Sequence, residues 1–549
     1  MCGIFALLNY SEISELVTKS FIRGSSRGPE NSKIEIYNSN IIIGFHRLAI
    51  NGLNEYSNQP LNIGGIVLVC NGEIYNYKNL AKEHNIKLKT GSDCEIIVRM
   101  YQLYGMEYTL GLLDGVFSLF LYDTEINACY AARDPYGVRP LYCFIENDTI
   151  GFASEIKSLY NLVKYKPNIF EFEPGNYVTI NDTLKVNRYI SFPFREIQYN
   201  DVFGEDCTKL NKQIVGYLEN AVKKRIDGTT DRPIACLLSG GLDSSLVCAL
   251  VNKYYNKKLE TYSIGLPGSE DLKYARIVAD HLNTDHHEII IDEQTFFDSI
   301  PEVIQKIESY DTTTVRASVG NYLIAKYIKN NSEAKVIFNG DGADEIMGGY
   351  LYFHKAPNEY EFDKECKRLL TDISKFDVLR SDRCIASNGL EARTPFLDKS
   401  FVDFYLSIPK ILRYHPNGGK CEKYLIRNAF SKIIPDLLPD CVLWRTKEAF
   451  SDGVSSLNRS WFSVIHANIN KLCEKDKALN KNLDQTIEIY KKLRLHNPPI
   501  TIEQSYYRYI YNKHYRDTDY IIPYFWMPKF IDSTDSSART LKIYSELKN

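Results

Sequence analysis

The sequence lacks several features that would assign it to common classes of protein. No apolar run reaches the roughly 18 residues that a membrane-spanning helix needs. The N-terminus lacks a basic segment followed by an apolar one, so we expect no secretory signal peptide. The 13 cysteines are odd in number and form no CxxC pair or compact framework. This cysteine usage argues against a disulfide framework and predicts a reduced, cytoplasmic protein.

Concentrated positive charge, internal repeats and low-complexity segments are also absent. The formal net charge is −3, the pI is about 6.4, and the lysines and arginines are scattered along the chain. A nucleic-acid partner would need a basic surface, so we expect none. Hydrophobic residues make up 44% and charged residues 25% of the chain, as in globular proteins. A length of 549 residues exceeds one ordinary core and predicts at least two domains.

The first 190 residues are rich in short β-like runs separated by Gly, Asn and Asp turns. The predicted strands are residues 34–37, 41–45, 66–70, 117–122, 128–132 and 142–145. Two helices interrupt them, one over residues 13–22 and one that begins at Ser92-Asp93 with a capping residue. This pattern predicts an α+β domain of packed sheets flanked by helices over residues 2–190.

From about residue 205, single apolar strands alternate with longer helices. The predicted strands are residues 234–238, 261–266 and 335–339, and the predicted helices are residues 242–255 and 272–282. Strands that are apolar throughout and alternate with helices predict an α/β domain with a mostly parallel sheet covered on both faces. After about residue 360 the pattern is mostly helical, so this domain has a helical C-terminal part and spans residues 205–549. Residues 185–207 carry few periodic signals and make the predicted linker.

Cys2 is the first candidate for catalysis. Removal of the initiator methionine would leave a cysteine whose thiol and α-amine belong to one residue. An α-amine titrates at about 7.7 to 8.0, so it could accept the thiol proton directly or through a water. By position alone a cysteine in second place is more often incidental, and the other motifs decide its interpretation.

A glycine-rich loop between a predicted strand and a predicted helix is the second candidate. It reads Ser239-Gly240-Gly241-Leu242-Asp243-Ser244-Ser245. Glycines let backbone amides approach an anion, hydroxyls add donors, and the helix N-terminus adds a partial positive charge. The pattern therefore predicts a phosphate-binding loop that is neither a Walker loop nor a GxGxxG fingerprint. Because Asp243 would repel a phosphate, we expect Mg²⁺ between them.

An acidic loop follows the predicted strand 335–339 and reads Asn339-Gly340-Asp341-Gly342-Ala343-Asp344-Glu345. Neighbouring parallel strands end at one edge of a sheet, so Asp344 could reach the metal that Asp243 binds. Alone, such a loop is more often a solvated turn or a calcium site. Beside a phosphate loop, a nucleotide site is favoured.

With Cys2-Gly3-Ile4 at its start, the chain resembles the glutamine-hydrolysing asparagine synthetase family over nearly its whole length. The blocks that carry the resemblance in the first half are residues 27–29, 47–50, 58–61, 71–76, 91–95 and 133–137. In the second half they are residues 239–245, 265–269, 310–318, 391–398, 444–448, 525–529 and 536–539. The resemblance implies an N-terminal-nucleophile glutaminase domain, an αββα sandwich, followed by an ATP-pyrophosphatase-type synthetase domain.

The resemblance also implies a role for each residue of the glutaminase site. Cys2 would attack the side-chain amide of glutamine, and Asn71 with the backbone of Gly72 would form the oxyanion hole. Arg47 would bind the glutamine α-carboxylate as a bidentate guanidinium. Glu73 and Asp93 would accept the α-ammonium. The implied glutamine-binding set is Arg47, Leu48, Ala49, Ile50, Asn71, Gly72, Glu73 and Asp93.

In the synthetase site the resemblance implies that ATP adenylates the β-carboxylate of aspartate, and that ammonia then displaces AMP. The implied ATP-binding set is Leu238, Ser239, Gly240, Gly241, Asp243, Ser244, Ser245, Ile264, Asn339 and Gly340. Asp243 and Asp344 would bind Mg²⁺. The implied aspartate and intermediate set is Thr313, Arg316 and Glu345, and Lys447 would neutralise pyrophosphate or the adenylate.

The acidic loop departs from the usual family pattern, Ser-Gly-Glu-Gly. Asp341 stands in place of a glutamate tied to adenylate formation, which keeps the carboxylate but shortens it by one methylene. A direct role would need a small backbone shift or a bridging water. Asn339 stands in place of a serine that would hydrogen-bond adenine.

The chemistry also predicts a passage between the two sites. Ammonia is mostly protonated at neutral pH, and release away from bulk water would keep it as the free base. We expect apolar and small side chains to line the passage.

Two alternatives stay open at this point. A related amidotransferase or synthetase could adenylate a different carboxylate, as a β-lactam-forming relative does, but such relatives commonly lack Cys2. A catalytically silent homologue would be expected to lose Cys2, Asp243 or Asp344, and all three are present. The expected partners are small molecules, namely glutamine, aspartate and ATP. A homodimer is the candidate assembly, which the sequence does not settle.

Overall fold

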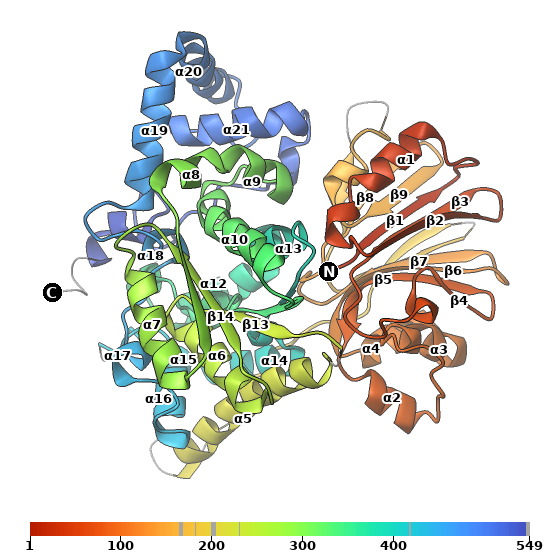
Figure 1. Ribbon diagram of the computed structural model, residues 1–549, viewed down its shortest axis with the longest axis horizontal. Helices are drawn as coiled ribbons and strands as arrows, with labels where there is room; N and C mark the ends of the chain where they lie inside the picture. Colours follow the sequence, from red (N-terminus) through yellow and green to blue (C-terminus); the bar gives the residue numbers. More distant parts are fainter. Residues whose placement is uncertain (164–167, 182, 199–204, 230, 417–418, 545–549) are drawn as a thin grey trace.

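The computed structural model describes residues 1–163, 168–181, 183–198, 205–229, 231–416 and 419–544. Its two halves lie side by side, with the N-terminus at their junction and the C-terminus on the far side of the second half (Figure 1). Among the described helices, none combines the length and the apolar character needed to cross a membrane.

The N-terminal half is a sandwich of two antiparallel six-stranded sheets. Its strands are β1 (Gly3–Leu8), β2 (Asn31–Tyr37), β3 (Ile41–Arg47), β4 (Leu61–Ile63), β5 (Ile66–Ile74), β6 (Gly115–Asp123), β7 (Ala128–Arg133), β8 (Tyr142–Glu146), β9 (Thr149–Ala153), β10 (Ile169–Glu171), β11 (Asn176–Ile180) and β12 (Leu184–Arg188). The strand orders are β10-β8-β9-β1-β3-β2 and β12-β11-β7-β6-β5-β4. Its helices are α1 (Glu15–Ile22), α2 (Tyr77–Glu83), α3 (Glu95–Tyr104) and α4 (Met106–Leu112).

Alternation along the strands builds the four layers of this half. In β1, Ile4 and Ala6 face the second sheet, whereas Phe5 and Leu7 pack on the side of α1. In β5, residues 67 and 69 face the first sheet, and residues 68 and 70 pack against α3 and α4. Successive strand side chains point to opposite faces, so both faces of each sheet are apolar and covered. The predicted αββα sandwich is confirmed.

The C-terminal half is built on a five-stranded parallel sheet of order β15-β14-β13-β16-β17. The strands are β13 (Ile234–Leu237), β14 (Glu260–Gly265), β15 (Asp285–Ile290), β16 (Val336–Phe338) and β17 (Glu391–Arg393). The helices in this part are α5 (Glu205–Asp227), α6 (Leu242–Tyr254), α7 (Glu270–Leu282), α8 (Glu293–Asp298), α9 (Ile300–Ile307), α10 (Thr312–Asn331) and α11 (Ala343–Met347). The predicted parallel sheet is confirmed.

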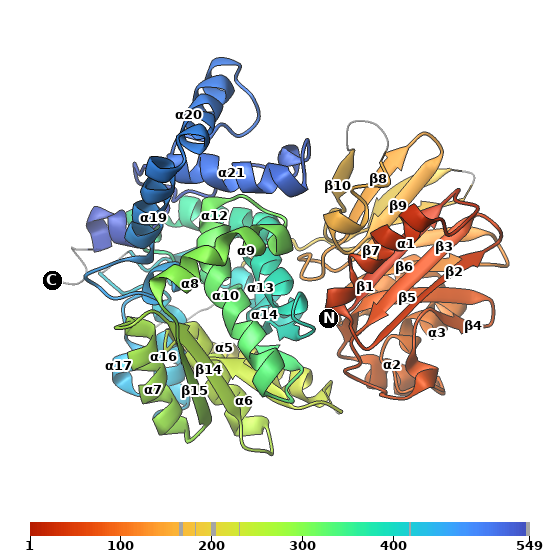
Figure 2. The same ribbon diagram turned by 45° about the horizontal axis from the view of Figure 1, so that its top comes forward.

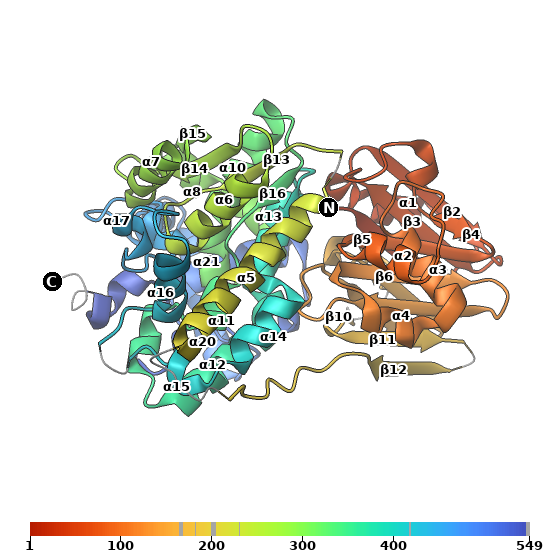
Figure 3. The same cartoon turned by 90° about the horizontal axis from the view of Figure 1, so that it is seen from below.

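Helices cover both faces of the parallel sheet, as Figure 2 shows. Ile234 and Cys236 of β13 pack with α5, α6 and α7, whereas Ala235 packs on the side of α8, α9 and α10. Figure 3 shows α5 running beneath the sheet beside α14 (Lys399–Ser407) and α16 (Tyr424–Ile433). The strands are therefore apolar on both sides, which explains their continuous hydrophobic runs.

The remaining described part is mostly helical, as expected. Its other helices are α12 (Glu359–Asp372), α13 (Asp377–Ala386), α15 (Lys410–Arg413), α17 (Asp440–Leu443), α18 (Phe450–Gly453), α19 (Trp461–Lys475), α20 (Lys477–Lys492) and α21 (Ile502–His514).

The predicted linker over residues 185–207 is wrong at both ends. Residues 185–188 belong to β12, which pairs with β11, and residues 205–207 belong to α5. Residues 199–204 of the predicted linker lie outside the described residues. The strand was missed because β12 is a short edge strand, whose two apolar side chains, Leu184 and Val186, are exposed and give only a weak signal.

The predicted helix start at residues 92 and 93 needs a smaller correction. Helix α3 begins at Glu95 without a side-chain cap. The carboxylate of Asp93 instead accepts a hydrogen bond from the backbone N–H of Ile74 at 2.7 Å. Asp93 therefore does not cap the helix. Its side chain lies in the first candidate site, at the end of β5.

Candidate active sites

The first candidate site lies at the start of β1, where Cys2 meets the neighbouring sheet. The backbone N–H of Cys2 donates to Asn71 Oδ1 at 3.0 Å, and its thiol donates to the carbonyl of Leu48 at 3.6 Å. Burial raises the pKa of the Cys2 thiol to about 11. In this chain Met1 still precedes it, and the Met1 amine is buried against the carbonyl of Leu390 at 3.1 Å. The thiol therefore needs a base close by before it can act as a nucleophile.

Asn71 offers a free donor beside this thiol. Its side chain is fully buried in β5, and its Nδ2 has no hydrogen-bond partner among the described residues. A buried N–H without a partner is costly, so this donor is available to a ligand that enters the site. The next residue, Gly72, has no room for a side chain, because a Cβ would lie 2.4 Å from the carbonyl oxygen of Val116. This geometry fits the implied oxyanion hole.

Arg47 closes a loop over the same site. Its guanidinium donates to the carbonyls of Asn51 at 3.1 Å and Asn54 at 3.3 Å, and to Asn58 Oδ1 at 2.7 Å. It also donates to the carbonyl of Gly52. Arg47 thus holds residues 51–58 in place through these hydrogen bonds. The binding of a glutamine α-carboxylate by Arg47 stays a prediction. Leu48, Ala49 and Ile50 continue from Arg47 and are buried, with the N–H of Ala49 donating to Glu30 at 2.7 Å.

Glu73 and Asp93 are two buried carboxylates at the end of β5. Burial raises the pKa of Glu73 well above its usual range, although Arg393 of the C-terminal half pairs with it at 3.0 Å. Burial also raises the pKa of Asp93 to about 6, against the opposing effect of the Ile74 N–H. Two neighbouring buried carboxylates that are hard to ionise suit a cationic ligand, such as an α-ammonium.

The second candidate site is a cavity at the carboxyl ends of β13, β14 and β16. Of the implied ATP-binding residues, those that line it are Leu238, Ser239, Gly241, Asp243, Ser244, Ile264, Asn339 and Gly340. Thr313, Asp341, Asp344, Glu345 and Lys447 line it as well.

Gly240 and Ser245 do not line this cavity but support the phosphate loop. Gly240 has φ of +69°, and a Cβ there would lie 2.4 Å from the backbone nitrogen of Ala275 in α7. Ser245 is fully buried in α6. Within the loop, Ser244 Oγ accepts from the N–H of Ser239 at 3.2 Å. The loop is therefore held in one shape by close packing and by its own hydroxyls.

Asp243 and Asp344 converge on the same cations. Lys423 Nζ lies 2.6 Å from the carboxylate oxygens of both aspartates, and Lys447 Nζ lies 2.5 Å from Asp344 and 3.6 Å from Asp243. Burial alone would raise the pKa of Asp344, but the two ammonium groups lower it below its usual range. The same carboxylates raise the pKa of Lys447, against the effect of burial. The two carboxylates are hard ligands of the kind that Mg²⁺ prefers, but the Lys423 ammonium lies between them, so Mg²⁺ at this position stays a prediction.

The acidic loop presents three further groups to the cavity. Asp341 Oδ1 pairs with Arg380 at 2.9 Å, while Oδ2 is buried without a hydrogen-bond partner in the described chain. The side chain of Asn339 donates to Ser381 Oγ at 2.7 Å, so one of its donors is already used. Glu345 accepts from the Tyr350 hydroxyl, and burial raises the pKa of Glu345 well above its usual range.

Arg316 is the implied substrate residue that the structure places elsewhere. Thr313, three residues before it in α10, lines the cavity, but Arg316 does not. Its guanidinium pairs instead with Glu503 at 2.6 Å and with Asp535 at 2.8 Å. Four of the five guanidinium donors are used by these two carboxylates, so the geometry does not favour a direct contact of Arg316 with a substrate carboxylate, which stays a prediction.

Sequence reasoning missed three residues of these sites, namely Lys423, Arg380 and Arg393. Lys423 precedes α16 and is 180 residues from Asp243, so no local pattern joins them. Arg380 and Arg393 are buried arginines in α13 and β17. The available signal was chemical, because a buried arginine needs a carboxylate and the acidic loops supply several.

Buried ions join the two sites across the junction of the halves. Arg27 donates to the carbonyl of Cys2 at 2.8 Å and pairs with Asp382 of α13 at 2.7 Å and 3.0 Å. Glu155 also pairs with Arg27, at 3.2 Å. The expected passage between the sites stays a prediction. Beside these ions, Cys2 also packs against an apolar cluster that contains side chains of both halves, Val138 among them.

Comparisons with known proteins agree with this arrangement. A glutamine amidotransferase domain model matches residues 1–196, and an asparagine synthase model matches residues 213–364 and 356–486. The asparagine synthetase [glutamine-hydrolyzing] of Gallus gallus is 41% identical over 571 aligned residues, covering 99% of each chain. The enzyme of the same name from Homo sapiens is 39% identical over 574 aligned residues, again with 99% of each chain covered. The chain belongs to the family of glutamine-hydrolysing asparagine synthetases.

Proposed function

We propose that this chain makes asparagine from aspartate, with glutamine as the nitrogen donor and ATP as the source of energy. The observation that carries the proposal is the presence of two complementary sites in one chain. Cys2 lies beside Asn71, whose Nδ2 has no partner among the described residues, and Asp243 and Asp344 converge under two lysines in the cavity. The family to which the chain belongs supports the same reaction.

In the glutaminase site, removal of Met1 would give Cys2 a free α-amine that accepts the thiol proton. The thiolate attacks the amide carbon of glutamine, and Asn71 Nδ2 with the Gly72 N–H stabilises the negative oxygen that develops. The C–N bond breaks as the α-ammonium of Cys2 returns its proton to the leaving nitrogen, which gives neutral ammonia and a γ-glutamyl thioester. Water then hydrolyses the thioester to glutamate. Glu73 and Asp93 hold the α-ammonium in place, and Arg47 binds the α-carboxylate.

In the synthetase site, a β-carboxylate oxygen of aspartate attacks the α-phosphorus of ATP and pyrophosphate leaves. The product is β-aspartyl-AMP, whose acyl carbon ammonia attacks to give asparagine and AMP. The phosphate loop holds the nucleotide, and Lys447 and Lys423 neutralise the charge that moves onto pyrophosphate. Asp243 and Asp344 would hold Mg²⁺, which supplies further neutralisation of the phosphates when bound. Thr313 and Glu345 position aspartate and the intermediate, and Asp341 acts with Arg380 at the adenylation step.

We also propose the organisation around these reactions. Residues 2–190 form the glutaminase domain and residues 205–549 the synthetase domain, which the separation of the two-sheet sandwich from the five-stranded parallel sheet supports. A cytoplasmic location is supported by the 13 cysteines, all of which are free thiols. The partners proposed are glutamine, aspartate and ATP, and a homodimer is the proposed assembly.

The test separates the two halves of the reaction. Asparagine and pyrophosphate are measured from ATP and aspartate with either glutamine or an ammonium salt. We expect Cys2→Ala to abolish synthesis from glutamine and to leave synthesis from ammonium unchanged, because the synthetase cavity is intact. Cys441→Ala, at an exposed cysteine, is the matched control and should change neither activity. Glutamine-dependent synthesis by Cys2→Ala would refute the role of Cys2.

The rival reading, a different carboxylate substrate, is tested with the same assay. Aspartate is replaced in turn by glutamate, succinate and malonate, and pyrophosphate release is measured. We expect release with aspartate alone. Release with another acid, together with none from aspartate, would favour the rival enzyme.

A further inference from the structure

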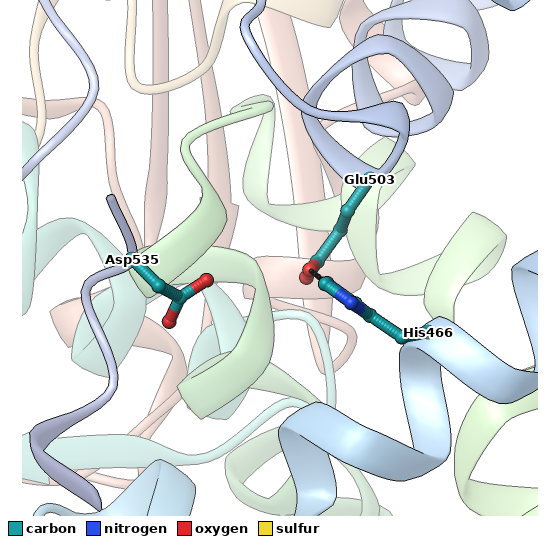
Figure 4. A group of neighbouring side chains, drawn as sticks. All are labelled: His466, Glu503 and Asp535. Carbon is teal, nitrogen blue, oxygen red and sulfur yellow. Dashed lines mark hydrogen bonds and ion pairs between the residues drawn. The ribbon is translucent and has the colours of Figure 1, made fainter. Parts of the chain in front are cut away.

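One cluster of side chains has the spacing of a cation site but already contains a cation of its own. Among the described residues, His466 of α19, Glu503 of α21 and Asp535 bring their ligand atoms within 4.8 Å of one another (Figure 4). The Arg316 guanidinium contacts both carboxylates at 2.6 Å to 2.8 Å. The cluster is therefore an ion-pair anchor that fixes Asp535 to α10. Asp535 belongs to residues 531–544, which we call the tail segment.

The tail segment continues from this anchor to a second buried contact. The hydroxyl of Ser537 donates to Asp452 Oδ1 at 2.6 Å, and the N–H of Ala538 donates to Asp452 Oδ2 at 3.1 Å. Asp452 is 1% exposed and lies in α18. A buried carboxylate needs donors, and here the tail segment supplies them.

A third contact lies next to the catalytic lysine. The guanidinium of Arg539 lies 3.5 Å from the carboxylate of Glu448 and donates to the carbonyl of Ser456 at 2.8 Å. The hydroxyl of Tyr544 also donates to Glu448. The side chains of Arg539 and Glu448 are 8% and 4% exposed. Arg539 thus ties Glu448 to Ser456 at the far end of one loop.

That loop, residues 444–456, carries Lys447 and has little regular structure to hold it. No helix or strand covers residues 444–449, and only the one-turn helix α18 follows. Lys447 is held by its backbone N–H, which donates to Glu422 at 2.8 Å, and by Nζ, which lies 2.5 Å from Asp344 and 3.6 Å from Asp243 in the cavity. We call residues 444–456 the lysine loop. Its position depends on contacts from other segments, which include a backbone hydrogen bond from Leu266 to Val454.

We propose that Arg539 is a positioning residue for adenylation, because through Glu448 it fixes the lysine loop so that Lys447 stays over Asp344. The inference rests on the proposed function of the synthetase site. Glu448 is covalently next to Lys447, so the contacts of Arg539 with Glu448 and Ser456 limit how far the backbone between them can move. A misplacement of about 1 Å at a charged group in the transition state can cost about 100-fold in rate. The tail segment, far from the phosphate loop in sequence, is thereby part of the synthetase site.

The experiment compares four full-length variants with the wild type. Arg539→Ala removes the guanidinium. Arg539→Lys keeps the positive charge but loses the planar set of N–H donors, and Tyr544→Phe removes a single hydroxyl. Arg516→Ala is the matched control, because Arg516 is 81% exposed. The measurements are kcat and KM for ammonia-dependent asparagine synthesis, kcat for glutamine hydrolysis, and the thermal unfolding midpoint.

We expect Arg539→Ala to lower the kcat of synthesis by about 10- to 100-fold, with KM for aspartate and glutamine hydrolysis unchanged. Arg539→Lys should recover part of the loss, and Tyr544→Phe should show a smaller loss at an unchanged unfolding midpoint. Arg516→Ala should behave as the wild type. A general loss of folded protein would lower synthesis and glutamine hydrolysis together, so unchanged hydrolysis at an unchanged unfolding midpoint separates the two causes.

Wild-type kcat for synthesis in Arg539→Ala would overturn the inference. Equal losses of synthesis and glutamine hydrolysis would also overturn it, since they indicate a structural role alone. If Arg539→Ala does not fold, a folded Tyr544→Phe with full kcat overturns it. A wild-type protein that makes no asparagine from either nitrogen source would instead refute the proposed function.

Discussion

Replacing Lys423 by methionine tests whether the two candidate metal ligands depend on a built-in cation. Lys423 is 1% exposed, and its ammonium lies 2.6 Å from both Asp243 and Asp344. Methionine keeps most of the volume but removes the charge, which leaves two carboxylates facing each other. Breaking a buried ion pair costs about 3 to 5 kcal/mol.

The structure places the expected cost near the lower end of this range. Asp243 and Asp344 are 13% and 16% exposed, and Lys447 remains 2.5 Å from Asp344. We therefore expect Lys423→Met to lower the free energy of unfolding by about 3 kcal/mol. Added Mg²⁺ should restore more stability to the variant than to the wild type, because a ligand that binds only the folded state stabilises it.

The assay is urea unfolding followed by tryptophan fluorescence, with and without Mg²⁺. All three tryptophans, Trp444, Trp461 and Trp526, lie in the C-terminal half, so the signal reports on the half that contains the site. The control is Lys253→Met, which breaks an ion pair to Glu219 at a lysine that is 43% exposed. This control should cost less than about 1 kcal/mol. A Lys423→Met protein as stable as the wild type, and unaffected by Mg²⁺, would refute the reasoning.

Two further predictions concern the glutaminase site. Because burial raises the pKa of Asp93 to about 6, and only the ionised carboxylate attracts an α-ammonium, glutamine affinity should fall by about tenfold for each pH unit below 6. Calorimetric titration of Cys2→Ala between pH 5 and 8 measures this, and an affinity independent of pH would contradict it. Arg47→Lys should raise the KM for glutamine by about tenfold or more, because an ammonium cannot donate to several carbonyls of residues 51–58 in a fixed fork. Ammonia-dependent synthesis by that variant should not change, and kinetics with both nitrogen donors check the pair of outcomes.

Local patterns predicted the parts of the molecule in which one stretch of chain determines its own geometry. The strand, glycine loop and helix around Gly240 form as expected, because the backbone conformation at that glycine excludes a side chain. The meeting of Asp243 and Asp344 also followed from sequence, since β13 and β16 are parallel neighbours. The sequence could predict where these residues lie because each belongs to the short segment that follows a predicted strand.

The same patterns could not predict which partners a buried polar residue would choose. Helix α10 is buried on most of its surface, so its hydrophobic pattern does not show which neighbour Arg316 faces. The resemblance implied a substrate contact, but the carboxylates of Glu503 and Asp535, over 180 residues away in sequence, use four of its five donors. Lys423 was missed for the same reason. Long-range ion pairs carry no local signature in the sequence. Any of the many carboxylates in the chain could pair with a given lysine or arginine, and only the fold decides which one does.

The buried ions at the junction make the position of Cys2 depend on the C-terminal half. The two sheets of the N-terminal half do not by themselves create this dependence. Arg27 holds the carbonyl of Cys2 at 2.8 Å and is itself fixed by two bonds to Asp382. The residue before Asp382, Ser381, accepts from Asn339 in the synthetase cavity at 2.7 Å. Packed interiors shift between discrete arrangements rather than deform smoothly, so a rearrangement of α13 would reach the backbone of the nucleophile. The backbone of Cys2 and the cavity at Asn339 therefore share one buried connection, and a change at Asn339 has a short physical route to Cys2.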